Sequence, residues 1–399
     1  MVKKQALNMN QDISKRSAIK FVILLGLVSL FADMTYEAAR SITGPYLAIL
    51  GASATVVGFV AGFGELIGYT LRLLSGYLSD KTKKYWGLTI FGYIINLMAV
   101  PLLALAGQWW IAAGLIVTER VGKALRVPPR DAMLSHATYE MGRGWGFGIH
   151  EAMDQIGALL GPIIVALVLF LKGGYRTSFA ILLIPALLAI SILVVAKLLY
   201  PHPHNLEPKT VELETRGLSK IFWLYVIAIG LIAAGYADFP LIAFHFKKIS
   251  VVPDIWIPIF YAVAMGVDAV AALILGKLFD KIGILAMVFA AFISSIFAPF
   301  VFLGGFYFAL AGMIIWGIGM GAQESIMRAT VAGLVSADKR ATAYGIFSTG
   351  YGIFWFLGSA LMGILYDISI PVLIIFSVSI QLASIPILFL IFKKNKLAQ

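Results

Sequence analysis

The fold is decided by a short stretch that occurs twice in the sequence. Residues 76–81 are Gly-Tyr-Leu-Ser-Asp-Lys, and residues 276–281 are Gly-Lys-Leu-Phe-Asp-Lys. The two copies are 200 residues apart, about half of the 399-residue chain, and each follows a long apolar stretch. Self-similarity at one fixed shift is the signature of an internal duplication. The sequence therefore predicts two structurally related halves.

The composition places these halves in a membrane. Hydrophobic residues make up 60% of the chain and charged residues 13%, whereas soluble domains have about 45–50% and about 25%. A soluble fold of this size buries only about three quarters of its surface, so the surplus of apolar side chains must face lipid. The chain has no cysteine, which excludes thiol catalysis and cysteine-bound metal or iron–sulfur centres.

Twelve apolar stretches reach the length of about 20 residues that a bilayer-spanning helix needs. They begin near residues 18, 54, 86, 109, 143, 177, 219, 254, 284, 306, 341 and 370. We therefore expect an all-α membrane protein with twelve transmembrane helices in two pseudo-symmetric six-helix bundles. The predicted parts are an N-terminal tail 1–17, a first bundle 18–199, a polar linker 200–217, a second bundle 218–393 and a C-terminal tail 394–399.

The positions of the basic residues predict the orientation of the spans. Of 31 Lys and Arg residues, 22 fall on the tails, the linker and the predicted loops of one side. The loops of the other side hold four, namely Lys172, Arg176, Lys247 and Lys248. Because basic residues gather on cytoplasmic loops, we expect a multi-pass protein of the cytoplasmic membrane with both termini in the cytoplasm. This asymmetry explains the net charge of +11 without a nucleic-acid partner. The first apolar stretch is also too long for a removable signal peptide.

Several motifs resemble those of the major facilitator superfamily. Gly76-x-Leu78-x-Asp80-Lys81, after the second span, resembles the signature loop of that superfamily, and the stretch from Gly276 to Asp280 and Lys281 resembles its weaker second copy. Arg120-x-Gly122 in the fourth span resembles its second motif. Gly157-x-x-x-Gly161-Pro162 in the fifth span resembles a motif that it associates with antiporters. Residues 119–132 resemble a hallmark of mostly uncharacterised bacterial and archaeal members. The resemblance implies the major facilitator fold and a transport function, and it implies no cofactor.

The first predicted span carries three ionisable residues, Asp33, Glu37 and Arg40. A charge at the bilayer centre costs about 2.5–3.5 kcal/mol on insertion scales, so such residues either pair with one another or form a path for substrate or protons. Their spacings of four and three residues place all three on one helix face. Two carboxylates one turn apart repel each other when both are ionised, and Arg40 can neutralise one of them. This triad is the best candidate for a proton site.

The second and fourth spans carry further charges. Glu65 and Arg72 are too far apart to pair, so each needs a partner on another helix, and we interpret them as structural. Lys123 is one turn from Glu119 and can pair with it. Arg120 then needs another acidic partner, and the resemblance makes it a coupling or gating residue. The candidate partners of Arg120 are Asp33, Glu37 and Asp154.

The fifth span holds His150 and Asp154 one turn apart. Histidine titrates near neutral pH, so the pair is either a proton relay or a packing histidine with a hydrogen-bond partner. In the second half, Asp238 stands alone, and Glu324 and Arg328 are spaced for an ion pair within one helix. The second half carries fewer charges, so we expect proton coupling mainly in the first half.

The two signature loops suggest a gate. Asp80 and Asp280 each end one span and precede the next, where the dipole of a neighbouring helix N-terminus favours a carboxylate. We expect Gly76 and Gly276 to permit close packing one turn earlier. Our hypothesis is that Asp80 latches the cytoplasmic side of the outward-facing state by pairing with Arg130 or Arg143.

These observations together predict a secondary transporter that works by alternating access. Proton-coupled export of an organic or drug-like compound is the first choice, with the substrate, protons and the lipid bilayer as partners of a monomeric chain. Transport of a metal cation by Asp33, Glu37, His150 and Asp154, or of an inorganic or organic anion, is the alternative. A membrane-embedded enzyme or sensor is the rival from another class, but no nucleophile–base pair, phosphate-binding loop or metal-ligand cluster stands out.

Overall fold

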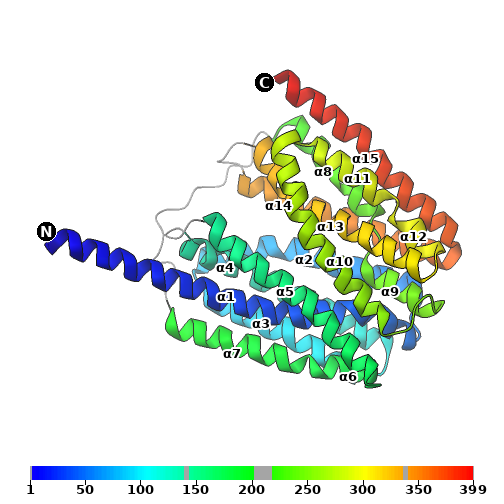
Figure 1. Cartoon of the computed structure of the whole chain (residues 1–399), viewed down its shortest axis with the longest axis horizontal. Coiled ribbons are helices and arrows are strands. Elements are labelled where there is room, and N and C mark those ends of the chain that lie inside the picture. The colour runs from blue at the N-terminus through cyan, green and yellow to red at the C-terminus, as the bar shows by residue number, and fades with distance from the viewer. Residues whose placement is uncertain (1, 139–142, 202–217, 336–339, 399) are drawn as a thin grey trace.

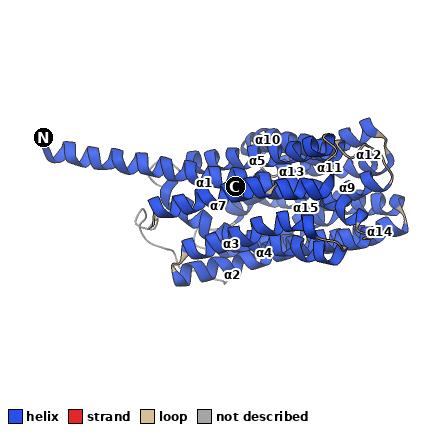
Figure 2. Cartoon of the chain, turned by 90° about the horizontal axis from the view of Figure 1, so that it is seen from below, coloured by secondary structure: helices blue, strands red, loops and turns tan. Residues whose placement is uncertain are grey.

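The computed structural model describes residues 2–138, 143–201, 218–335 and 340–398, with the side chains of most of them. Across these ranges the chain folds into helices without a strand (Figure 2). The predicted linker 200–217 therefore lies almost entirely outside the described residues. The long helices run roughly side by side along the long axis of the molecule (Figure 1).

The first half contains six helical segments, of which the last has a break. They are α1 (Val2–Ile49), α2 (Ala54–Thr82), α3 (Tyr85–Leu102) with the short 3₁₀ turn η1 (Leu103–Leu105), α4 (Trp109–Thr138), α5 (Arg143–Phe170), and α6 (Gly174–Ile181) with α7 (Leu183–Leu199). The second half repeats this plan. Its segments are α8 (Lys220–Gly235) with α9 (Phe239–Lys248), α10 (Trp256–Ile282), α11 (Leu285–Ser295) with α12 (Phe297–Leu303), α13 (Phe306–Leu334), α14 (Arg340–Ile368) and α15 (Ile370–Ala398).

The prediction of twelve spans is confirmed by these segments. Eleven are long and apolar enough to cross a membrane. The twelfth is α4, and its charges, from Glu119 to Arg130, explain why apolar composition alone does not mark it. It packs between α2 and α3 inside the first half. Apolar side chains cover the outside of the bundle, for example Leu105 at 78% and Leu198 at 74% exposure. The chain is therefore a multi-pass membrane protein.

The break between α8 and α9 brings an acidic residue into the bundle. Asp238 has an extended backbone and is the N-cap of α9, and Pro240 follows within the first turn. A proline lacks the backbone N–H that a continuous helix would need there. The carbonyl of Ala237, freed by the break, accepts a hydrogen bond from Trp316 Nε1 at 2.9 Å. Backbone groups inside a membrane need such a partner, so the break is a built feature of the fold.

The two halves meet mainly along the helix pairs α1 with α9, α2 with α14 and α5 with α10. Small residues bring these helices together. Gly44 of α1 lies against the backbone of Pro240, and Gly62 of α2 lies against Phe356 of α14. We call the end of the bundle that holds the loop Lys83–Lys84 the terminal end, because both chain termini lie there (Figure 1). The end that holds the loop Leu50–Ser53 is the opposite end.

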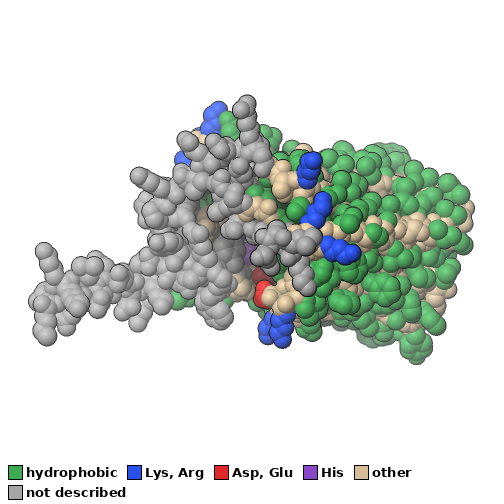
Figure 3. Space-filling model, turned by 90° about the horizontal axis from the view of Figure 1, so that it is seen from above, with side chains coloured by type: hydrophobic (Ala, Val, Ile, Leu, Met, Phe, Trp, Pro, Cys, Tyr) green, Lys and Arg blue, Asp and Glu red, His purple; other side chains and the backbone are tan. Residues whose placement is uncertain are grey.

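The two halves are joined at the opposite end. The backbone N–H and the hydroxyl of Thr55 donate hydrogen bonds to Asp367 Oδ2 at 2.8 and 2.7 Å. Lys248 Nζ lies 3.9 Å from the other oxygen of the same carboxylate. On the face shown in Figure 3, Lys and Arg side chains gather toward the end that carries the termini, and the remainder is largely hydrophobic. The charge asymmetry read from the sequence therefore reappears on this surface.

Candidate functional site

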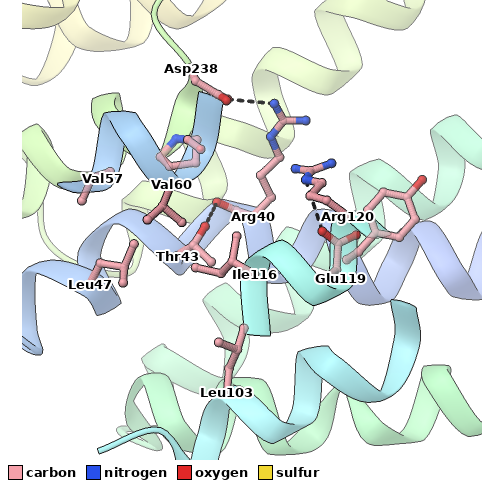
Figure 4. Close-up of a pocket in the computed structure, with 13 residues that line it drawn as sticks. Arg40, Thr43, Leu47, Val57, Val60, Leu103, Ile116, Glu119, Arg120 and Asp238 are labelled. Carbon is pink, nitrogen blue, oxygen red and sulfur yellow. Dashed lines mark hydrogen bonds and ion pairs between the residues drawn. The ribbon is translucent and has the colours of Figure 1, made fainter. Parts of the chain in front are cut away.

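The candidate site lies where α1 faces the break between α8 and α9. Asp33, Glu37 and Arg40 share the inward face of α1, as predicted, and the two carboxyl residues are 7% and 8% exposed. Arg40 Nη2 lies 2.8 Å from Asp238 Oδ1, which belongs to the second half (Figure 4). Trp355 Nε1 donates a 3.3 Å hydrogen bond to the other oxygen of Asp238. An ion pair between the halves thus stands in the interior of the protein.

Arg40 forms its ion pairs with residues other than its neighbours on α1. Besides Asp238, it contacts Glu65 Oε1 at 3.4 Å. Its guanidinium acts on Glu37 only through the electrostatic field. Glu37 has two other partners, since Tyr261 of α10 donates a 2.5 Å hydrogen bond to its Oε2 and Lys123 Nζ lies 3.8 Å from its Oε1. The Tyr261–Glu37 bond is a second link between the halves.

Glu65 and Arg120 join α2 to α4 beside this site. Arg120 Nη2 lies 3.3 Å from Glu65 Oε1, and Arg120 Nε lies 3.2 Å from Glu119 Oε2. None of the three partners considered for Arg120 is its ion-pair partner, so that expectation is corrected. Glu65 was read as a structural residue that needs partners on other helices, and the structure supplies two. In the sequence, Glu65 and Arg72 are seven residues apart, which is too far for an ion pair within one helix. This spacing was the indication that Glu65 needs partners on other helices.

The expected pair of Lys123 with Glu119 is replaced by contacts with α1. Lys123 Nζ reaches Glu37 and lies 3.9 Å from the centre of the Tyr36 ring, a cation–π contact. Glu119 Oε1 instead accepts a 2.6 Å hydrogen bond from Asn96 Nδ2 of α3. Lys123 faces α1 and not its own helix neighbour because two acceptors, a carboxylate and an aromatic face, lie there.

A polar chain lies on the terminal side of Arg40. Tyr36 donates a hydrogen bond to Asp33 Oδ1. His150 Nδ1 lies 3.6 Å from Asp154 Oδ2, so these two residues are paired as expected. His150 Nε2 lies 3.1 Å from Ser29 Oγ, which also accepts a 2.9 Å hydrogen bond from Arg130 Nη1. These contacts connect Asp154 to Arg130 through two groups that can give and accept protons.

Glycines of α5 let this helix pack close to α1. A Cβ atom at Gly157 would lie 3.0 Å from Asp33 Cβ, and one at Gly161 would lie 3.0 Å from Ala38 Cβ. Pro162 follows inside the same helix. Small residues at these two positions let α5 approach α1 at the level of Asp33. The antiporter-like motif therefore has a definite packing role in this protein.

The signature loops fit the expectations less well. A Cβ atom at Gly276 would meet nothing within 4 Å, and one at Gly76 would make only an ordinary 3.7 Å contact with Pro128. The expected close packing at these two glycines is therefore wrong. Lys81 and Asp280 are exposed at the ends of α2 and α10.

Three predicted side chains lie outside the part of the chain whose side chains are described. They are Asp80, Arg143 and Arg328. The latch of Asp80 and the pair of Glu324 with Arg328 therefore stay predictions. Arg130, a proposed partner of Asp80, forms an ion pair with Asp131 at 2.8 Å. Glu324 accepts a 3.4 Å hydrogen bond from Gln155 of the other half.

A small cavity extends from Arg40 toward the opposite end (Figure 4). Its polar lining includes Arg40, Glu119, Arg120 and Asp238, and apolar residues such as Leu47, Val57 and Ile116 form much of the remaining wall. The volume of this cavity is about 30 Å³, which is room for roughly two water molecules. Pockets for organic ligands measure about 300–1,000 Å³, so this conformation admits water and must open to admit a solute. Among the described residues, no group of three or more His, Asp or Glu is arranged to hold a metal ion.

Sequence comparison finds relatives over most of the chain. The profile of the Major Facilitator Superfamily matches residues 25–359 and, in a second match, 256–398. An uncharacterised protein of Mycobacterium tuberculosis is 40% identical over 94% of this chain and 93% of its own length. An uncharacterised MFS-type transporter of Methanocaldococcus jannaschii is 29% identical over 92% of this chain and 94% of its own length. Multidrug resistance protein MdtH of Proteus mirabilis is 28% identical over 29% of this chain and 28% of its own length.

Solved structures share the fold at low sequence identity. A POT family transporter, solved with a thioalcohol-conjugated peptide, has a TM-score of 0.75 at 12% identity and covers 94% of this chain and 96% of its own. The nucleoside transporter NupG has a TM-score of 0.73 at 14% identity, over 92% of this chain and 99% of its own. These similarities confirm the architecture of two six-helix bundles.

Proposed function

The chain belongs to the Major Facilitator Superfamily, and we propose that it exports a small organic solute across the cytoplasmic membrane in exchange for protons. The protein is a transporter and not an enzyme. In this proposal it works as a monomer by alternating access, with both termini in the cytoplasm. The basic residues at the terminal end support that orientation. Folds of this kind place their ligand near the membrane midplane, between the two halves.

The observation that carries the proposal is the ion pair between Arg40 and Asp238. It joins the two halves at the inner end of the cavity, beside the broken helix α8–α9. A solute that enters between the halves must separate this pair, and its own polar groups can then satisfy the separated charges. Breaking a buried ion pair is strongly unfavourable when nothing replaces the lost partner. Because the solute replaces the lost partners, its binding is linked to the movement of the two halves.

The lining of the site supports an organic substrate with an apolar body and a polar end. Val57, Val60 and Ile116 offer an apolar wall, and the charged groups stand at one end of it. A cationic group can take the place of Arg40 beside Asp238 and Glu65. The partial relatedness to multidrug resistance proteins MdtH supports export of a drug-like compound.

Proton coupling is supported by the carboxyl groups on the terminal side of Arg40. Asp33, Glu37 and Asp154 belong to α1 and α5, two first-half helices that pack against α9 and α10. A proton that binds one of these carboxyl groups removes a negative charge from α1 or α5. Both helices must move against the second half during transport. One charge that crosses 100 mV releases about 2.3 kcal/mol, which is enough to concentrate a solute about fifty-fold.

The experiment is a flux assay with the purified full chain in liposomes. A pH gradient is imposed, and transport of an organic cation, ethidium, is compared with transport of an organic anion, fluorescein, and of Mn²⁺. A pH-sensitive dye in the lumen records proton movement that depends on each probe. Gradient-driven ethidium transport with opposite proton movement is expected. Equal dye signals in protein-containing and empty liposomes for all three probes would reject the proposal.

A further inference from the structure

Asp268 is a buried carboxyl in the second half that takes no part in the ion pairs described above. It lies on the inward face of α10 and is 1% exposed. It follows Tyr261 by seven residues, which is two helical turns, so both side chains share one face. Gly321 of α13 lies against its backbone carbonyl. The carboxyl group therefore sits close to the contact between α10 and α13.

Among the described residues, Asp268 differs from the other buried carboxylates in having no hydrogen-bond or ion-pair partner. Its Oδ1 is buried without a hydrogen-bond partner, and within the described residues no ion pair binds this side chain. By contrast, Glu37, Glu65, Glu119 and Asp238 each contact at least one cationic side chain. An ionised carboxylate that is buried without a partner is costly, whereas a protonated carboxylic acid carries no charge.

Among the described residues, the charged groups that act electrostatically on Asp268 are acidic. They are Glu324 on α13, Glu151 on α5 and Glu37 on α1, and the phenol of Tyr236, just after α8, also interacts electrostatically with Asp268. The side chain of Arg328, one turn after Glu324, lies outside what is described. Negative neighbours on three different helices disfavour a further negative charge and favour a bound proton.

These carboxyls form a series from the interior to the solvent. Glu37 is buried at the site between the halves, and Asp268 is buried on α10, two helical turns after the Tyr261 that binds Glu37. Glu324 and Glu151 are exposed, and the contact of Glu324 with Gln155 lies between the two halves. Glu324 and Glu151 are therefore the exposed members of this group, and Asp268 and Glu37 are its buried members.

We propose that Asp268 is a proton-binding residue of the transport cycle, which holds a proton in this conformation and exchanges it with solvent past Glu324 and Glu151. In the exchange, water at the exposed side takes the proton, the O–H bond of the acid breaks, and the carboxylate that remains is neutralised again by the next proton. The role in transport rests on the proposed function, but the bound proton does not.

The test is infrared difference spectroscopy of the purified full chain between mildly acidic and alkaline buffer. The C=O stretching band of a protonated carboxylic acid should be present in acidic buffer and lost in alkaline buffer. The intensity assigned to one carboxyl should disappear in Asp268→Asn and persist in Asp254→Asn, which changes an aspartate paired with Lys247 at the opposite end. An identical band in wild type and Asp268→Asn would overturn the inference. If the asparagine variant does not fold, Asp268→Glu should retain the band at a shifted frequency, and an unshifted band would also overturn it.

Flux measurements separate this inference from the proposed function. In liposomes, Asp268→Asn should retain exchange of ethidium at equal concentrations and lose the accumulation driven by an imposed gradient, whose limit is a concentration ratio of about ten per pH unit for one coupled proton. Gradient-driven transport that is unchanged in the variant contradicts the coupling role and leaves the proposed function standing. Absence of transport in wild type rejects the proposed function, and the infrared band still decides the protonation of Asp268.

Discussion

Arg40 Nη2 and Asp238 Oδ1 are 2.8 Å apart, although the two residues are separated by 198 positions in the sequence. Their ion pair connects α1 to the N-cap of α9, so it ties the first half to the segment that closes the opposite end. The neighbouring backbone contact of Gly44 with Pro240 is on the same pair of elements. We therefore expect opening of the opposite end to separate Arg40 from Asp238.

Loss of this pair should open the opposite end. Asp238→Asn removes the charge and keeps the size of the side chain. A hydrogen bond between charged groups contributes about 1.5–3 kcal/mol, so the open population should rise at least about tenfold. The chain has no cysteine, so a single cysteine at Val57, which is buried in the cavity wall, reports the change. Its labelling by a membrane-impermeant maleimide from the opposite end should accelerate.

The matched control for this labelling is Asp254→Asn. It removes the ion pair of Asp254 with Lys247, two second-half residues at the same end, where Lys247 also lies 5.8 Å from the centre of the Tyr175 ring of the first half. Labelling of the cysteine at position 57 should keep the wild-type rate in this control. A rate that does not change in Asp238→Asn either would show that the pair does not hold the opposite end closed.

Substitution of Glu65 should destabilise the first half. Its Oε1 lies 3.4 Å from Arg40 and 3.3 Å from Arg120, so Glu65→Gln leaves two buried guanidinium groups short of an acceptor. Removal of one partner of a buried pair costs about 3–5 kcal/mol. Thermal unfolding of the detergent-purified protein should therefore occur at a clearly lower temperature. The double variant Glu65→Gln/Arg120→Gln should recover part of the loss, and additive losses would contradict the pairing.

Substitution of Gly157 should separate α5 from α1. A side chain there meets the carbonyl of Leu30 and the Cβ of Asp33, and overpacking typically costs about 1–3 kcal/mol. Gly148 lies on the same helix with nothing within 4 Å of a Cβ position, so Gly148→Ala should stabilise the helix by about 0.5–1 kcal/mol. Unfolding temperatures of the two variants should move in opposite directions. A shift of the same sign in both would argue against the close approach at Gly157.

Neutralisation of Asp33 should uncouple transport from protons. Asp33→Asn retains an acceptor for the Tyr36 hydroxyl but cannot bind and release a proton at this position. Accumulation driven by a pH gradient should fall to the level of empty liposomes, while exchange at equal concentrations on both sides should continue. The two assays are run on the same liposome preparation. Gradient-driven accumulation at the wild-type level would place the coupling proton elsewhere, with Asp268 as the next residue to examine.

The fold followed from the sequence with few corrections. The twelve spans, the two halves and the multi-pass membrane character are all confirmed, including α4 with its charged residues. The sequence named candidate site residues but did not predict which of them pair. Asp33, Glu37, Arg40, Arg120 and His150 do lie inside the bundle, yet the expected partners of Arg120 and Lys123 were wrong. Asp268 was not among the predicted site residues, because a single aspartate in a sequence shows neither its burial nor its lack of a partner.

The sequence by itself determined that this chain is a duplicated bundle of membrane helices, because apolar length and the repeat at residues 76 and 276 are local properties of the chain. Only the tertiary structure decided which charges meet. Arg40 finds Asp238 because α8 ends before Pro240 and presents an aspartate to the other half. The energy of a buried charge depends on groups within a few ångströms. Those groups come from other helices, whose positions cannot be derived from residue spacing in the sequence.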